Sequence, residues 1–153
     1  MAVQDAISLL KADHKKVKAL LEALEKTTQR AEKRRVTLLD QIESELTVHT
    51  NIEETIFYPA FRDAVKKKDD REMYFEALEE HHVVKLVLPE LKATDPSSEP
   101  FAAKAKVLKE LVTHHAGEEE REMFPAAKRV MDKAELQQLG ARMLEKKKKL
   151  LAR

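Results

Sequence analysis

The chain has 153 residues, of which 37% are charged and 42% hydrophobic, and its formal net charge is only +1. This length suits one domain with a buried core, and the near-neutral charge gives no general argument for binding nucleic acid or a membrane surface. The absence of cysteine excludes disulfides, cysteine-ligated zinc and thiol catalysis, while two glycines and five prolines favour an all-α protein over a turn-rich sheet.

Apolar residues recur at steps of three and four along almost the whole chain, which is the spacing of one helix face. The first such segment begins at Asp5, whose side chain is suited to cap a helix, and its apolar face extends to Leu24. The second runs from about 36 to 66. The charged stretch 66–70 is predicted to form the next turn, and a third helix is predicted over about 71–91.

The second half of the chain begins with its clearest loop, residues 94–100, which is rich in serine and proline. A fourth helix is predicted over about 100–129, and a last amphipathic helix over about 133–153. Four long helices with short connections predict an up-down-up-down four-helix bundle. We therefore expect a bundle domain at residues 1–130 and an additional C-terminal helix at 131–153 that packs on the bundle or extends it.

The two halves of the chain repeat each other loosely. Each half has a helix with one histidine, followed by a helix with the pattern His-x-x-x-Glu and then a further glutamate, an aromatic residue and a proline. The matched pairs are His14 with His81, His49 with His115, Glu53 with Glu119, Glu54 with Glu120 and Pro59 with Pro125. Each proline is expected to kink or end its helix locally.

The repeated histidines and glutamates predict a dinuclear metal site. Residues four apart share a helix face, so each His-x-x-x-Glu pair points the same way, along the apolar stripe. A buried ionised glutamate is costly unless it is paired or binds metal. Imidazole and carboxylate ligands together suit iron, manganese or zinc rather than calcium or magnesium. The predicted ligands are His14, His49, Glu53, His81, His115 and Glu119.

Two of the histidine assignments have neighbouring alternatives. A single inward histidine is more often an ordinary core or cap residue than a ligand. The third helix also has a second possible stripe through His82, and His114 directly precedes His115. The repeat alignment favours His81 and His115 as the inward pair, which leaves His82 and His114 to support the site or to face solvent.

Residues beside the predicted ligands have possible supporting roles. Glu54 and Glu120 lie five residues after a histidine, so they are poorer ligands but suitable hydrogen-bond acceptors for one. Phe57 and Met123 lie one turn beyond the glutamates and are expected to form an apolar wall. Tyr58 is expected either to supply a proton or electron near the metals or simply to pack at a helix end.

The combined pattern resembles the hemerythrin-like family, also called HHE cation-binding domains, over about residues 5–130. The family pattern is His, His-x-x-x-Glu, His, His-x-x-x-Glu, and the stretches ADHKKVKALLEALE, EEHHVVKLVL and FYPAF are also similar to the family. The resemblance implies two non-haem iron ions with a bridging oxo or hydroxo group, with zinc or manganese as the less favoured metals. In the leading hypothesis below, the four histidines hold the ions, and Glu53 and Glu119 bridge them.

The resemblance does not extend to oxygen transport. Oxygen-carrying hemerythrins have a fifth histidine where this chain has Lys85, and their final acidic ligand is an aspartate one residue later than Glu119. Relatives with the present pattern act in peroxide decomposition, nitric oxide or oxidative stress responses, iron handling and redox sensing. The leading hypothesis is therefore a diiron protein that reacts with H2O2, O2 or NO, with catalase-like turnover. The alternative is an iron- or redox-sensing or iron-handling module without turnover.

The sequence also gives an expectation for location and partners. The N-terminus has no basic region followed by a long apolar run, and no apolar stretch approaches membrane-spanning length. We therefore expect a cytoplasmic protein whose ligand is a small oxidant, with no nucleic acid and no membrane as partner.

Overall fold

The computed structural model describes residues 4–152, and all the regular secondary structure within them is helical, which confirms the all-α class. Met1–Val3 and Arg153, at the outer ends of the two predicted domains, lie outside the described residues. In chain order the elements are α1 (Ala6–Glu25), α2 (Glu32–Ile52), η1 (Glu53–Phe57), α3 (Tyr58–Ala64), α4 (Lys68–Lys92), α5 (Glu99–Glu118), η2 (Glu119–Met123), α6 (Phe124–Val130) and α7 (Lys133–Leu151). None of these helices is both long and apolar enough to cross a membrane.

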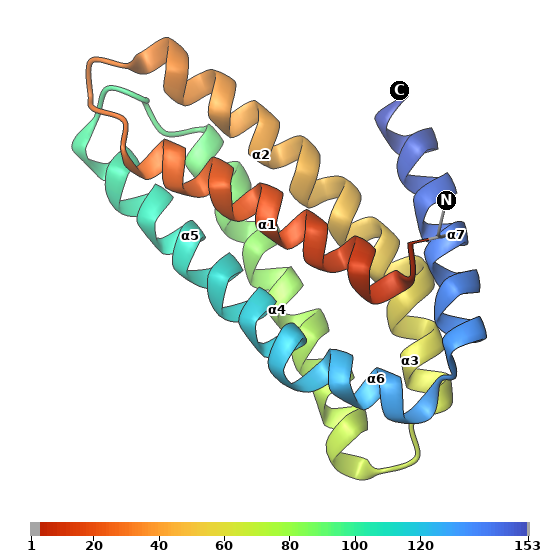
Figure 1. Ribbon diagram of the computed structural model, residues 1–153. Helices are drawn as coiled ribbons and strands as arrows, with labels where there is room; N and C mark the ends of the chain where they lie inside the picture. The colour runs from red at the N-terminus through yellow and green to blue at the C-terminus, as the bar shows by residue number, and fades with distance from the viewer. Residues whose placement is uncertain (1–3, 153) are drawn as a thin grey trace.

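Four long helical segments lie side by side and run in alternating directions (Figure 1). Two of them are single helices, α1 and α4. The other two are composite, because α2 continues through η1 into α3, and α5 continues through η2 into α6. Helix α7 returns along the end of the bundle where α1 begins, and packs against α1, α2 and η1.

The interior contains two apolar clusters with a polar layer between them. One cluster lies toward the loops that follow α1 and α4, and includes Leu21, Leu38 and Leu108. The other lies toward α7 and is dominated by aromatic residues such as Phe57 and Phe124. Because both clusters exclude water, polar side chains in the layer between them must find partners within the protein.

Most predicted helix boundaries agree with the structure to within a few residues, and Asp5 caps α1 by accepting a hydrogen bond from the Ser8 backbone at 2.7 Å. The predicted turn at 66–70 was partly wrong. Its last three residues form the first turn of α4, which begins at Lys68. Asp69 and Asp70 lie in that turn, where their negative charges suit the positive end of the helix dipole.

The two matched prolines widen their helices rather than ending them. Each follows a five-residue π-helical turn, and the closing bonds run from the Tyr58 and Phe124 backbone N–H groups to the Glu53 and Glu119 carbonyl oxygens. Proline offers no N–H, and its ring clashes with the carbonyl four residues earlier in an α-helix. The wider turn accommodates the ring, and the helix continues as α3 or α6. Both π turns begin at a predicted ligand.

Helix α7 approaches the start of α1 closely enough to require glycine. Leu136, Leu139 and Met143 bury its apolar face. A Cβ added to Gly140 would lie 2.3 Å from the carbonyl oxygen of Gln4, and this neighbour is backbone. Backbone atoms have little freedom to move aside, so the small size of Gly140 sets the docking distance of α7.

We expect Gly140→Ala to lower the free energy of unfolding by about 1–3 kcal/mol, the usual cost of overpacking a well-packed contact. Gly117→Ala is the matched control, because a Cβ there would meet only the flexible end of the Arg121 side chain. Both changes bring the same gain in helix propensity. Denaturant titration of both variants checks the prediction, and equal stabilities would contradict the close-packing argument.

Candidate metal centre

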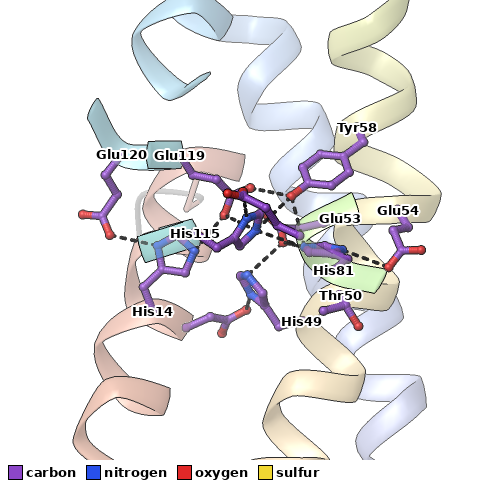
Figure 2. A network of polar contacts seen from close by, with 12 residues as sticks. His14, His49, Thr50, Glu53, Glu54, Tyr58, His81, His115, Glu119 and Glu120 are labelled. Carbon is purple, nitrogen blue, oxygen red and sulfur yellow. Dashed lines mark hydrogen bonds and ion pairs between the residues drawn. The ribbon is translucent and has the colours of Figure 1, made fainter. Parts of the chain in front are cut away.

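The structure brings all six predicted ligands together in the polar layer (Figure 2). They come from every long segment of the bundle, since α1, α2, α4 and α5 each supply a histidine and each π turn supplies its first residue, a glutamate. Their exposed fractions range from 0% to 8%. His81 and His115 face inward, whereas His82 and His114 are exposed, as the repeat alignment predicted.

Each glutamate lies between imidazole nitrogens from the two halves of the chain. The Nε2–Oε1 distances are 3.0 Å for His49–Glu53, 3.1 Å for His81–Glu53, 3.0 Å for His14–Glu119 and 3.4 Å for His115–Glu119. Two groups of possible ligand atoms result. One contains His14, His49, Glu53 and Glu119, the other contains His81, His115 and Glu53, and Glu53 is common to both.

Every one of the four histidines is held from behind by a carboxylate at its second ring nitrogen, Nδ1. The pairs and their Nδ1–oxygen distances are His14–Glu120 at 2.9 Å, His49–Asp13 at 2.9 Å, His81–Glu54 at 2.9 Å and His115–Glu80 at 2.7 Å. A hydrogen bond donated by Nδ1–H fixes the tautomer and leaves the Nε2 lone pair free to bind a metal. All four imidazoles are therefore oriented toward the two glutamates.

The sequence predicted two of these four carboxylates and missed the other two. Glu54 and Glu120 accept hydrogen bonds from histidines, as expected from their place after the ligand glutamates. Asp13 and Glu80 were missed, although each directly precedes a repeated histidine, at His14 and His81. Their matching positions in the two halves were the signal that could have revealed them.

The spacing of two histidine nitrogens and the buried polar atoms without hydrogen bonds both fit a metal-bound arrangement. The Nε2 atoms of His81 and His115 lie 3.1 Å apart. Two imidazole nitrogens that each lie about 2.1 Å from one ion, at a right angle, are separated by about 3 Å. His49 Nε2 lies 3.0 Å from Glu53 Oε1 but does not form a hydrogen bond with it, and the buried Glu53 Oε2 makes no hydrogen bond to any residue within 4–152. Buried polar atoms without partners are costly, so this donor set suits a cation.

The electrostatics of the layer also favour a cation. Burial alone would lower the pKa of His115, but the carboxylates of Glu119 and Glu80 raise it to about 9. His49 likewise has a raised pKa, because Glu53 and Asp13 outweigh the effect of burial. Burial and the charge of Glu53 raise the pKa of Glu119. Without metal, protons on His49 and His115 partly balance the negative charge, and bound cations would replace them.

Tyr58 also contacts the predicted ligands, although it was not predicted to be one of them. Its hydroxyl donates a hydrogen bond to Glu119 Oε2 at 2.7 Å and lies 3.1 Å from Nε2 of His81 and 3.3 Å from Nε2 of His115. The side chain is fully buried, and burial together with Glu119 and Glu53 raises its pKa well above the ordinary tyrosine range. Tyr58 is thus positioned within the centre, which contradicts a purely packing role at a helix end.

A small apolar cavity adjoins the imidazoles on the side toward the loops. All four histidines line it together with Val17, Leu46, Val84 and Val112, and its volume is about 20 Å³. This is room for about one water-sized molecule. The expected apolar wall of Phe57 and Met123 lies in the other cluster, toward α7. The centre therefore has an apolar cluster on each side, with room for about one water-sized molecule next to the imidazoles.

A helical bundle with this buried His and Glu cluster defines a metal-binding protein, and the comparisons with known proteins give its family. Residues 5–127 match the model of the family "Hemerythrin HHE cation binding domain". The chain belongs to this family, which confirms the resemblance seen in the sequence. It also supports metal binding, because the family is defined by a cation-binding domain.

The relatives are of several kinds. The chain is 28% identical over 153 residues to a DNA nickase from Nostoc sp., but it spans only 41% of that protein's length. It is 31% identical over 140 residues to the uncharacterized protein Rv2633c of Mycobacterium tuberculosis, covering 91% of this chain and 83% of the relative. The crystal structure of an HHE cation binding domain-containing protein, the Rv2633c homolog from Mycobacterium kansasii, matches with a TM-score of 0.83 and 30% identity over 98% of this chain and 88% of that one.

Proposed function

We propose that this protein is a non-haem diiron protein that reacts with small oxidants, and that it decomposes hydrogen peroxide in a catalase-like reaction. The observation that carries the proposal is the convergence of four carboxylate-backed imidazole nitrogens on two buried glutamates. The fold in this proposal is an up-down-up-down four-helix bundle formed by the four long segments, and α7 is an additional helix outside it. His14 and His49 would hold one ion, His81 and His115 would hold the other, and Glu53 and Glu119 would serve both.

The composition of the layer is compatible with iron. Imidazole and carboxylate donors without thiolates suit iron, manganese or zinc, and the family resemblance favours iron among them. The layer contains six carboxylates, and within residues 4–152 only two lysine ammonium groups contact them. The six are those of Glu53, Glu119, Asp13, Glu54, Glu80 and Glu120. This excess of negative charge would be balanced by two divalent cations.

When bound, a pair of iron ions would supply electrons to, and accept them from, ligands such as H2O2, O2 or NO. The chain's own residues prepare the place where this happens. The carboxylates at Nδ1 hold the imidazoles in one orientation, and the two apolar clusters exclude bulk water. The apolar cavity that all four histidines line, with room for about one water-sized molecule, lies beside the place where such a ligand would bind.

The experiment that tests the proposal begins with iron per chain, by elemental analysis of anaerobically loaded protein. We expect about two irons per chain and an absorption spectrum with ligand-to-iron charge-transfer bands. The loaded protein should then release O2 from H2O2 much faster than the same concentration of free iron. Peroxide loss no faster than with free iron would remove the catalytic proposal, while zinc or no metal would remove the diiron proposal.

We expect Tyr58→Phe to retain about two irons but to decompose peroxide about 100-fold more slowly, the lower end of what a positioned proton donor contributes. The hydroxyl lies 2.7 Å from Glu119 Oε2, so it can hold a proton at the centre. The ring packing against Tyr74 and His81 would remain. Oxygen release at matched iron content checks the prediction, and Tyr74→Phe is the control. An unchanged rate in the Tyr58 variant would show that its hydroxyl has no part in turnover.

A further inference from the structure

Among residues 4–152, lysines contact two of the four carboxylates that accept from the histidines. Lys85 of α4 contacts Glu54, with Nζ–oxygen distances of 2.8 Å and 2.7 Å, and Glu54 accepts from His81. Lys147 of α7 contacts Asp13 at 2.5 Å, and Asp13 accepts from His49. One lysine therefore lies behind a histidine of each proposed metal position.

The two lysine pairs differ in burial. The Lys85–Glu54 pair is partly open to solvent, with side-chain exposures of 52% and 26%. The Lys147–Asp13 pair is nearly closed, with exposures of 21% and 5%. Exposed ion pairs contribute little because water screens them, whereas removing one partner of a buried pair leaves a charge without compensation. Loss of Lys147 should therefore matter more than loss of Lys85.

The position of Lys147 depends on the docking of α7. Its helix is fixed by the buried residues Leu136, Leu139 and Met143 and by the close approach at Gly140. The adjacent Lys146 reaches across to Thr55 in η1, with an Nζ–Oγ1 distance of 2.9 Å. Lys147 thus comes from a segment outside the repeated halves, and no corresponding helix covers His81 and His115.

We infer that α7 supports the metal centre through Lys147. Lys147 holds Asp13, and Asp13 orients His49. Retention of the ion at His14 and His49 therefore depends on α7. The ion at His81 and His115 does not depend on it. The two metal positions are consequently unequal in the support that their histidines receive from α7. This inference rests on the proposed two-ion centre, and Lys147 is a positioning residue that touches neither ion.

The test compares Lys147→Met with three matched variants of the full-length chain. Lys85→Met removes the equivalent lysine from the more exposed pair, Lys146→Met removes a neighbouring charge of α7, and Lys147→Arg retains the charge. Each protein is loaded anaerobically with Fe²⁺, dialysed against a series of chelator concentrations and analysed for iron per chain. Helix content by circular dichroism verifies that each variant is folded.

For Lys147→Met we expect one of the two ions to be released at a chelator concentration about tenfold lower than in the unmodified protein. This is the smaller end of the usual effect of removing an outer partner of a metal ligand. The second ion should leave at the unmodified concentration. Anomalous scattering from crystals of the half-loaded variant should locate the remaining iron beside His81 and His115. Lys146→Met and Lys147→Arg should behave like the unmodified protein, and Lys85→Met should show a smaller change.

Three results for Lys147→Met would overturn the inference. These are retention of both ions as in the unmodified protein, loss of both ions together, and loss of the ion at His81 and His115 first. An equal effect of Lys146→Met would also overturn it, since the general charge of α7 would then be responsible. Failure of the unmodified protein to bind two irons is distinct from all of these, because it would remove the proposed diiron centre itself.

Discussion

Replacement of Glu53 by alanine is expected to abolish binding of both ions. Glu53 Oε1 lies 3.0 Å from Nε2 of His49 and 3.1 Å from Nε2 of His81, so this one carboxylate serves both proposed metal positions. Its side chain is completely buried. Iron analysis after anaerobic loading should give close to zero ions per chain, and peroxide decomposition should fall to the level of free iron.

Glu54→Ala is the matched control for this prediction. Glu54 is the next residue and also a glutamate, but it contacts His81 through Nδ1 rather than the metal-facing Nε2. Removal of such an outer partner typically weakens metal binding 10- to 100-fold without abolishing it. At saturating iron the control should therefore still hold about two ions. If Glu53→Ala also held two ions, Glu53 would have no bridging role.

Loading with metal is expected to raise the free energy of unfolding by about 4 kcal/mol at a free metal concentration 1,000 times the dissociation constant. The proposed ligands come from four segments far apart in sequence, so an unfolded chain does not present the same site. Metal also compensates the buried carboxylates, which are otherwise crowded together. Denaturant titration of metal-free and iron-loaded protein measures the difference.

The control for this stabilisation is the Glu53→Ala variant, titrated in the same two conditions. It should show no metal-dependent change, because it lacks the carboxylate common to both positions. An equal stabilisation of this variant would mean that metal acts elsewhere on the protein. No stabilisation of the unmodified chain, at a measured content of two ions, would mean that the site is equally available in the unfolded state.

The fold and the candidate ligands were largely predictable because helix periodicity and metal-ligand spacing are local properties of the sequence. His49 and Glu53 are four residues apart, so a helix alone places them on one face. The repeat then identified His81 over the adjacent His82, a choice that periodicity left open. Burial in the structure agrees with that choice. Metal binding by these side chains remains a prediction.

The features that the sequence did not reveal depend on contacts between distant segments. Asp13 approaches His49 across 36 residues, and Lys147 approaches Asp13 across 134, and no local pattern encodes such distances. The two π turns were also missed, because a proline in a helical pattern permits a kink, an end or a widened turn. Which of these occurs depends on the packing on either side of Pro59 and Pro125.

The carboxylates behind His14 and His81 each come from the opposite half of the chain. Glu120 of the second half supports His14, and Glu54 of the first half supports His81. Neither half therefore contains a complete set of partners for its own first histidine. The arrangement is that of a closed two-fold homodimer whose subunits have been joined in one polypeptide. Joining them makes assembly of the centre independent of protein concentration, and it allows each half to acquire changes that symmetry would otherwise impose on both.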